Sequence, residues 1–476
     1  MKTWLRTVAA TAAIVSTCML SNTASAAGRT LYVTTDGTDS ASCGAQTSSC
    51  RSITQGIENA ADGDTILVGA GKYGHVSGKY ASDGNISYTG PGDEHPRELP
   101  SLLPLVNGCV VCIDKAVSIY SLHGASVTVI EGSPFTDEVA NVMILHEGVN
   151  FGAPGRGFTI TSTSMDGSHF GVLMAQSDPT GFSNLGIHLK SNISIAGNVD
   201  LRDRTGFSFQ GRPYSDSVCP VDDCVATATI TFSQNQSFNN SFAAFDMTQG
   251  LFRTGYVVVQ NNYALGAGTG FQVPGGSQIS FSNAGQDSSR ISLTGNVAER
   301  NALGFYTLAP GDVIGNTAAD NYAGGFYVIA GRANFQNNTA VGNGAPGLLL
   351  QFFRNDLTTP PSTVSFKSFT QNNFYGNDRD RPPLTVPVSQ FPETTRDPGP
   401  SAHCGILNMG ILPFYSDEVG NPVIPVAFNA NGNFWGSTRG PSATGAADAV
   451  GGPCDQNGAT TTVTSYASAG FAITTH

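Results

Sequence analysis

The chain has 476 residues, of which 12% are Asp, Glu, Lys or Arg and 40% are hydrophobic, and its formal net charge is −12. This balance excludes a disordered chain and a coiled coil, both of which need a higher proportion of charged residues. An acidic chain with scattered basic residues also offers no basic face for nucleic acid. The 57 Gly and 33 Asn, with Asn concentrated in the second half, favour strands and turns over long helices.

The N-terminus has the features of a secretion signal. Lys2 and Arg6 precede an apolar run over 8–20, and the small residues at 24–26 fit a cleavage site. An apolar run of about 13 residues is too short to span a bilayer, which disfavours a retained membrane anchor. We therefore predict a signal peptide over 1–26, export to the extracellular space or periplasm, and no membrane span in the mature chain.

A short helix is predicted near the start of the mature chain. Ile53, Ile57 and Ala60 share one helical face, and Gly63 suits the end of such a helix. A coil of stacked strands exposes its core at its open end, so an amphipathic helix there would act as a cap.

Eight cysteines remain after the predicted cleavage, and an even number in an exported chain favours disulfides. Their spacing suggests four pairs, namely Cys43/Cys50, Cys109/Cys112, Cys219/Cys224 and Cys404/Cys454. Connectivity stays open, because eight cysteines allow 105 pairings. The CxxC spacing at 109–112 also fits a redox or zinc site, but no second CxxC accompanies it, so we favour a structural disulfide.

A repeat with a period of about 20 to 22 residues runs through the centre of the chain. Each copy has an Asn, a second Asn five residues later, and a large apolar residue nine or ten positions after the first. Clean copies start at Asn296, Asn316 and Asn338, and looser copies start at Asn198, Asn235, Asn262 and Asn373. Stacked coils would align these Asn side chains into a ladder of amide hydrogen bonds.

The repeats also contain short strand-like segments, at 256–259, 279–281, 291–293 and 325–329. If each coil stacks on the next, Phe305, Phe326 and Leu348 form one inward column. The pattern of a leucine-rich repeat is absent, which leaves a parallel β-helix as the predicted architecture.

Three features together resemble the right-handed parallel β-helix, pectate-lyase-like superfamily. They are the stretch 50–73, which in that family is a capping helix followed by the first strands, the Asn/Gly repeat, and the ending Asn433-Phe-Trp435-Gly436 followed by Gly-Pro-Ser at 440–442. The resemblance implies an all-β, right-handed, single-stranded parallel β-helix with a short N-terminal capping helix. We divide the chain into 27–75 for the cap and first coil, 76–442 for the β-helix and 443–476 for a C-terminal tail, and expect Trp435 to pack the last coil.

Many members of this superfamily bind or cleave polysaccharides along one long face. One position after the apolar column, strand alternation points a row of residues outward: Ser208, Asp246, Gln272, Tyr306, Tyr327 and Leu349. Tyr306 and Tyr327 would stack on sugar rings, while Arg212 and Arg354 would bind uronate carboxylates. The predicted catalytic residues, by the chemistry their side chains offer, are Asp246, Asp312 and Arg332.

We expect a polysaccharide lyase or glycoside hydrolase of an acidic glycan, with a non-catalytic adhesive protein that binds surface glycans as the alternative. The signature motifs of pectate lyases, polygalacturonases and alginate epimerases are absent, so the resemblance transfers no catalytic site. The histidines show no metal-ligand spacing, and no cofactor is predicted except the Ca²⁺ that a lyase mechanism would use. The expected partner is a polysaccharide, and the expected state is a monomer.

Overall fold

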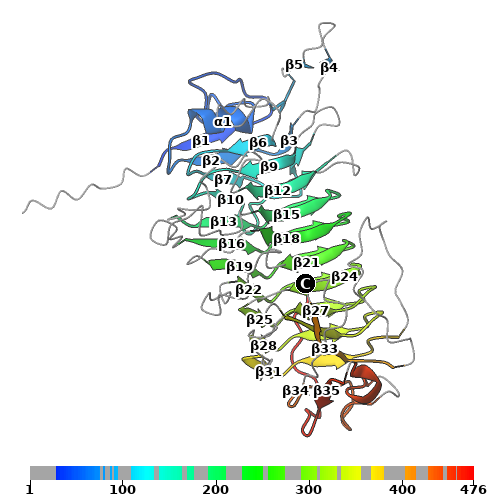
Figure 1. The fold of residues 1–476 in the computed structure, drawn as a ribbon. Coiled ribbons are helices and arrows are strands. Elements are labelled where there is room, and N and C mark those ends of the chain that lie inside the picture. Colours follow the sequence, from blue (N-terminus) through cyan, green and yellow to red (C-terminus); the bar gives the residue numbers. More distant parts are fainter. Residues whose placement is uncertain are drawn as a thin grey trace, which may run out of the picture.

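The computed structural model describes residues 28–74, 79–80, 86–87, 90–94, 109–132, 139–162, 169–175, 191–210, 228–249, 256–273, 291–307, 311–329, 334–354, 366–379, 402–413, 427–442, 447–456 and 458–476. Within these residues the chain winds into a long coil (Figure 1). Each turn of the coil adds one strand to each of three parallel sheets, which is the right-handed parallel β-helix predicted from the sequence.

Sheet I has 11 strands. They are β1 (Thr30–Val33), β2 (Thr65–Val68), β7 (Ser118–Ser121), β10 (Asn150–Phe151), β13 (Ile193–Ala196), β16 (Thr229–Ser233), β19 (Tyr256–Gln260), β22 (Ile291–Thr294), β25 (Asp312–Ile314), β28 (Asn334–Gln336) and β31 (Ser368–Thr370).

Sheet II has 10 strands. They are β3 (Gly71–Gly74), β8 (Thr128–Glu131), β11 (Thr159–Thr161), β14 (Val199–Leu201), β17 (Gln236–Phe238), β20 (Tyr263–Leu265), β23 (Val297–Glu299), β26 (Thr317–Ala319), β29 (Thr339–Val341) and β32 (Asn373–Tyr375).

Sheet III also has 10 strands. They are β6 (Cys109–Ile113), β9 (Ala140–Ile144), β12 (Phe170–Ala175), β15 (Thr205–Gln210), β18 (Ala243–Gln249), β21 (Thr269–Val273), β24 (Leu303–Thr307), β27 (Phe326–Ile329), β30 (Leu348–Arg354) and β33 (Ile406–Pro413). Outside the coil, β4 (Lys79–Tyr80) pairs with β5 (Ile86–Ser87), and β34 (Ala427–Asn429) pairs with β35 (Thr460–Thr462).

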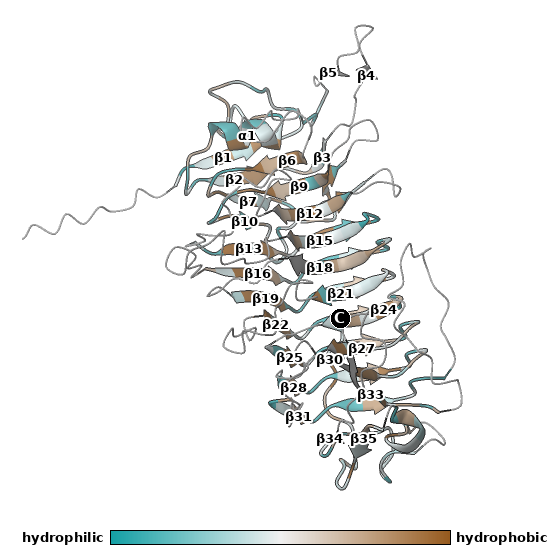
Figure 2. Ribbon diagram, viewed as in Figure 1, coloured by the Kyte–Doolittle hydropathy of each residue, from teal (hydrophilic) through white to brown (hydrophobic). Residues whose placement is uncertain are grey.

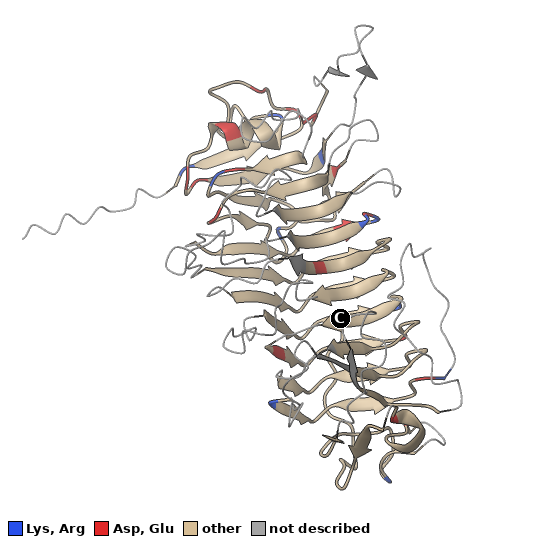
Figure 3. Ribbon diagram, viewed as in Figure 1, with Lys and Arg blue, Asp and Glu red and all other residues tan. Residues whose placement is uncertain are grey.

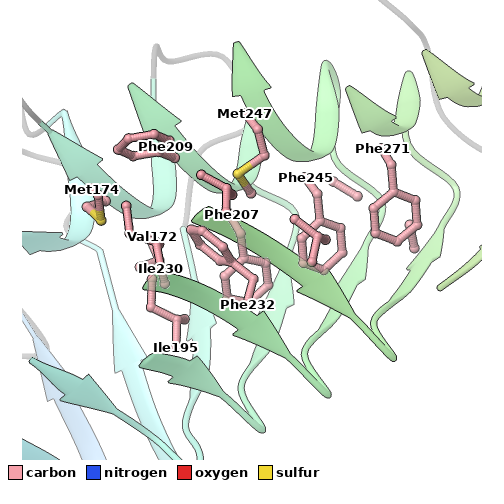
Figure 4. Close-up of a cluster of buried hydrophobic side chains, with 14 of the residues drawn as sticks. Val172, Met174, Ile195, Phe207, Phe209, Ile230, Phe232, Phe245, Met247 and Phe271 are labelled. Atoms are coloured by element: carbon pink, nitrogen blue, oxygen red, sulfur yellow. The ribbon is translucent and has the colours of Figure 1, made fainter. Parts of the chain in front are cut away.

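The interior of the coil is a continuous column of apolar side chains. Alternate residues of each strand point inward, and hydrophobic segments recur from strand to strand (Figure 2). On sheet III the register places Phe305 beside Phe326, and Phe326 beside Leu348, as predicted. The two Phe rings stack with centroids 4.7 Å apart, and the same column continues through Phe271 and Phe245 (Figure 4). Charged residues are sparse along the stacked strands (Figure 3).

The predicted asparagine ladder is confirmed where sheet I turns into sheet II. In each coil the Asn side-chain oxygen accepts two hydrogen bonds from the Asn of the previous coil, one from its backbone N–H and one from its side-chain amide. The first ladder consists of Asn198, Asn235, Asn262, Asn296, Asn316, Asn338, Asn372 and Asn433. The prediction that a repeat copy starts at Asn373 was wrong. The ladder residue of that coil is Asn372, whereas Asn373 begins strand β32.

A second ladder lies where sheet II turns into sheet III, formed by the Asn five residues later in each repeat. It runs through Asn301, Asn321, Asn343 and Asn377 and ends on the carboxylate of Asp448. Burial raises the pKa of Asp448 to about 7, although the two hydrogen bonds from Asn377 oppose the shift.

The capping helix α1 (Ile53–Asn59) closes the N-terminal end of the coil, and Ile53 and Ile57 are buried as predicted. Ser52 Oγ accepts the N–H of Gln55, and the buried carboxylate of Glu94 accepts the N–H groups of Ile53 and Thr54. These acceptors satisfy donors that the first turn of a helix leaves unpaired.

Three of the predicted disulfides are present, joining Cys43 to Cys50, Cys109 to Cys112 and Cys404 to Cys454. The fourth predicted pair, Cys219 and Cys224, lies outside the described residues, as do the signal segment 1–26 and the predicted strand at 279–281.

The last coil is packed by Trp435, as predicted, because its ring is fully buried and stacks on Phe374 at 5.2 Å. None of the helices in the described part of the chain is long and apolar enough to cross a membrane.

Candidate functional site

The outward row predicted from strand alternation is aligned in the structure. On the outer face of sheet III, successive register pairs join the residues that we call the outer row: Ser208, Asp246, Gln272, Tyr306, Tyr327 and Leu349. Neighbouring members therefore repeat at the spacing of the coils, about 4.8 Å. A row of this kind presents a linear series of side chains along the axis.

The two predicted stacking tyrosines lie face to face. The rings of Tyr306 and Tyr327 have centroids 5.0 Å apart and an interplanar angle of 21°. Tyr306 is partly exposed, whereas Tyr327 is only 3% exposed, so the pair offers one partly exposed ring rather than the open two-ring platform expected from the sequence. Burial raises the pKa of the Tyr306 hydroxyl.

The burial of Tyr327 has a local cause in a small apolar cluster on this face. Tyr327, Leu349 and Leu407 pack with Leu303 and Met409, separately from the main core, and Tyr306 packs against them. A second cluster at the other end of the face contains the Cys109–Cys112 disulfide with Met143 and Leu173. The alternation of residues along a strand predicts only that a side chain points out of the coil. It does not predict whether another side chain covers it.

Between these apolar clusters the outer row is polar. Ser208 and Asp246 are buried, with Asp246 4% exposed, and Gln272 is partly exposed. The buried Ser208 hydroxyl has no hydrogen-bond partner among the described residues, which leaves an unused donor next to the carboxylate. This polar centre, formed by Ser208, Asp246 and Gln272, is the candidate site.

The structure does not bring Asp312 to this site. Asp312 begins β25 on sheet I, whereas Asp246 lies in β18 on sheet III, more than two coils earlier, a displacement of about 11 Å along the axis alone. The Asp312 carboxylate instead accepts a hydrogen bond of 2.6 Å from Asn334 on the same face. Two carboxyl groups that cleave a glycosidic bond lie roughly 5 to 9.5 Å apart, so this pair does not have a hydrolase geometry.

Three arginines are predicted from the sequence to contact the substrate. Arg212 and Arg332 lie outside the described residues, and Arg354 is described only as the last residue of β30. The roles of Arg212 and Arg354 as uronate ligands and of Arg332 as a catalytic residue stay predictions.

The structure also shows two acidic residues that the sequence analysis did not select. Asp200 in β14 and Asp203 in the turn that follows it are both buried, within hydrogen-bond reach of each other. Asp200 accepts from Ser237 and Asn240, whereas Asp203 accepts from Asn141 and Ser162. Their surroundings form a closed network rather than an accessible site.

Loss of solvent raises the pKa of both acids, and the charge of Asp200 raises that of Asp203 further. The sequence did hold a signal for one of them, because Asp203 follows Asn198 by five residues and so takes the place of a second-ladder Asn.

No group of three or more His, Cys, Asp or Glu side chains in the described residues is arranged to hold a metal ion.

Comparisons with known proteins supply no identity: no family model, no curated protein and no solved structure matches this chain.

Proposed function

We propose that this protein is exported and binds an extended polysaccharide along the outer face of sheet III. The observation that carries the proposal is the register that aligns Asp246, Gln272, Tyr306 and Tyr327 in one outward row. Carboxylate, amide and phenol groups at a repeat of about 4.8 Å match the needs of a linear sugar polymer, whose successive rings offer hydroxyl groups and apolar faces.

Two further observations support an extracellular glycan as the partner. The N-terminal sequence has a signal-peptide pattern, and the three disulfides suit an oxidising compartment. The resemblance to the pectate-lyase-like superfamily, in which many members bind or cleave polysaccharides, supports the same class of ligand by analogy of fold.

If the bound polymer is cleaved, the geometry favours elimination over hydrolysis. The described part of the outer row holds a single carboxylate, Asp246, and the second predicted acid lies on another sheet. A lyase needs one base to remove the proton next to the uronate carboxylate, whereas a glycosidase needs two carboxyl groups across the bond. We therefore assign Asp246 as the base of a lyase reaction on an acidic glycan.

The test is a panel of polyuronates and neutral glycans incubated with the purified protein, with binding measured by calorimetry and cleavage by the absorbance of unsaturated uronates. Gln272→Ala should weaken binding about three- to tenfold, because it removes a hydrogen bond in the polar centre. Gln260→Ala is the matched control, since Gln260 is a partly exposed glutamine on the outer face of sheet I.

Asp246→Asn should abolish the new absorbance while binding is retained, because the amide keeps the shape of the carboxyl group but cannot act as the base. Binding by none of the glycans, or equal losses for the Gln272 and Gln260 variants, would overturn the proposed binding face. New reducing ends without unsaturated product would overturn the lyase assignment.

A further inference from the structure

The segment 466–476, which we call the strap, leaves the last coil and runs back along the outside of sheet II. Tyr466 pairs with Asn433 at the end of the first ladder, and Ala467 donates its N–H to Asn433 O at 3.0 Å. Farther on, Phe471 N donates to Asn373 Oδ1 at 2.8 Å, and Asn373 Nδ2 donates back to Phe471 O at 3.2 Å. The strap is thus bound through its backbone by an asparagine side chain of β32.

The rest of the strap crosses several more coils. Thr317 Oγ1 donates to Thr474 O at 2.7 Å, and Thr474 Oγ1 donates to Gly315 O. The ring of His476 stacks on Tyr263 with centroids 4.3 Å apart, and its Nε2 lies 3.2 Å from the side-chain nitrogen of Gln236. The Tyr263 ring is itself held by a hydrogen bond of 2.9 Å from its hydroxyl to Glu299.

Four residues whose side chains contact the strap, Gln236, Tyr263, Thr317 and Asn373, belong to one register column of sheet II. The strap column consists of Gln236, Tyr263, Val297, Thr317, Thr339 and Asn373. The strap therefore runs across the strands and along the coil axis, over a distance of about 24 Å for the five steps between β32 and β17. A linear polymer bound along the same face would follow the same path.

Burial follows the strap closely. Val297, Thr317, Thr339 and Asn373 are buried, with exposed fractions from 0% to 6%. The residues two positions farther along the same strands also point outward, yet those at 299, 319, 341 and 375 stay partly exposed. Solvent is therefore excluded from these four positions of the strap column and not from the neighbouring positions, while Gln236 and Tyr263 at the far end of the column are partly exposed.

The strap is bound in the manner of a removable ligand. It contains no Asp, Glu, Lys or Arg, and most of its own residues are exposed, including Ile473 at 42%. Its contacts include backbone carbonyl and N–H groups and one hydroxyl, which bond to Asn and Thr side chains or to backbone carbonyls. They also include the imidazole of His476, which stacks on Tyr263 and lies beside the Gln236 amide. Sugar hydroxyl and ring oxygens, together with the apolar face of a pyranose, offer the same set of interactions.

We propose that the strap column is a second binding track for an extended polysaccharide, and that the strap covers it as an intramolecular competitor. The inference rests on the proposed function for its class of ligand, but it concerns a different face of the coil. Release of the strap exposes Tyr263, Thr317 and Asn373 together, and it gives the protein a second site for the same polymer.

The experiment compares the full chain with a variant truncated after Tyr466, using calorimetric titration with the glycan panel. The truncated protein should gain a second binding event, which Tyr263→Ala in the truncated background removes and Gln272→Ala leaves in place. Phe471→Pro is a second route to the same state, because proline has no N–H to donate to Asn373 and leaves the rest of the strap present. Hydrogen exchange of the ladder amides confirms that the coil of each variant is folded.

The outcomes separate this inference from the proposed function. A binding event that is present in the truncated protein and absent from the full chain supports the strap column as a site, and this holds even if the full chain binds no glycan. Equal stoichiometry in the full and truncated proteins, with the coil folded in both, overturns it even if binding to the outer row is intact. A loss of folding on truncation, together with unchanged binding by Phe471→Pro, assigns the strap a purely structural role and overturns the inference as well.

Discussion

Replacement of Asn316 by alanine tests how much the first ladder stabilises the coil. The Asn316 side-chain oxygen accepts the backbone N–H and the amide N–H of Asn296 at 2.9 and 3.0 Å. Its amide nitrogen donates to Leu293 O at 2.9 Å and to Asn338 Oδ1 at 3.1 Å. Asn316→Ala therefore removes four hydrogen bonds from a position that is fully buried.

The cost follows from the groups that lose these bonds. Asn296 Nδ2 keeps its bond to Val259 O, and Asn338 Oδ1 keeps the backbone N–H of residue 316. The backbone N–H of Asn296 and the carbonyl of Leu293 lose their ladder partner in a site closed to water. An unsatisfied buried group costs about 1–3 kcal/mol, so we expect a loss of about 4 kcal/mol in the free energy of unfolding.

Denaturant unfolding followed by circular dichroism measures this loss, with the m-value checked for a change in cooperativity. Asn334→Ala is the matched control, because Asn334 is partly exposed and its side-chain amide bonds to Asp312 on the outer face of sheet I. Water replaces that partner, so the control should lose less than about 1 kcal/mol. Similar losses for the two variants would refute the idea that the ladder itself stabilises the coil.

Two other substitutions probe the interior. Gly325→Ala should destabilise the protein by about 1–3 kcal/mol, because the added Cβ would lie 2.6 Å from Gly347 O and 3.0 Å from Asn343 Nδ2. Gly470→Ala is the control: its Cβ would meet neighbours only at 3.5 Å, so the unfolding midpoint should change little. Equal shifts in the two variants would contradict this packing argument. Burial raises the pKa of the Asp448 carboxyl in the folded protein to about 7. The protonated carboxyl therefore contributes its full stabilisation below pH 4. As the pH rises from 4 through 7 this contribution is lost, which lowers the free energy of unfolding by up to about 4 kcal/mol. Asp448→Asn should remove this part of the pH dependence, making the variant the more stable protein at pH 8, and identical pH profiles would show that the carboxyl does not titrate as inferred.

The repeat could be read from the sequence because each part of it has a strict spatial counterpart. The five-residue offset between two Asn side chains places one at each corner of sheet II, as with Asn316 and Asn321. The inward column of Phe305 and Phe326 followed from the apolar residue nine or ten positions after the first Asn of each copy. The error at 372–373 is the expected kind, since two adjacent Asn residues satisfy the pattern equally well and only the register decides between them.

Neither the closure of the outer row nor the strap could be predicted in this way. Tyr327 is buried by neighbours from other coils, Leu349 of the outer row and Leu407, and Leu407 lies outside the repeat copies found in the sequence. Phe471 meets Asn373 across 98 residues of sequence, and the small, uncharged residues around it carry no periodic signal. Contacts made outside the coil depend on tertiary packing, which sequence periodicity does not encode.

A parallel β-helix separates the residues that hold it together from those that are free to bind. The ladders and the stacked aromatic column use the interior and two corners of every coil, so function is left to the outward positions of the three sheets. On sheet III these positions are partly closed by apolar clusters around a polar centre, and on sheet II one column is covered by the strap. A polymer that follows the coil axis can use either face without disturbing the interior. A substitution at Gln272 in the full chain, or at Tyr263 in the truncated chain, should therefore change binding and leave the unfolding midpoint nearly unchanged. The same assay on Asn316→Ala should show the reverse, because the ladder supports both faces and contacts neither ligand.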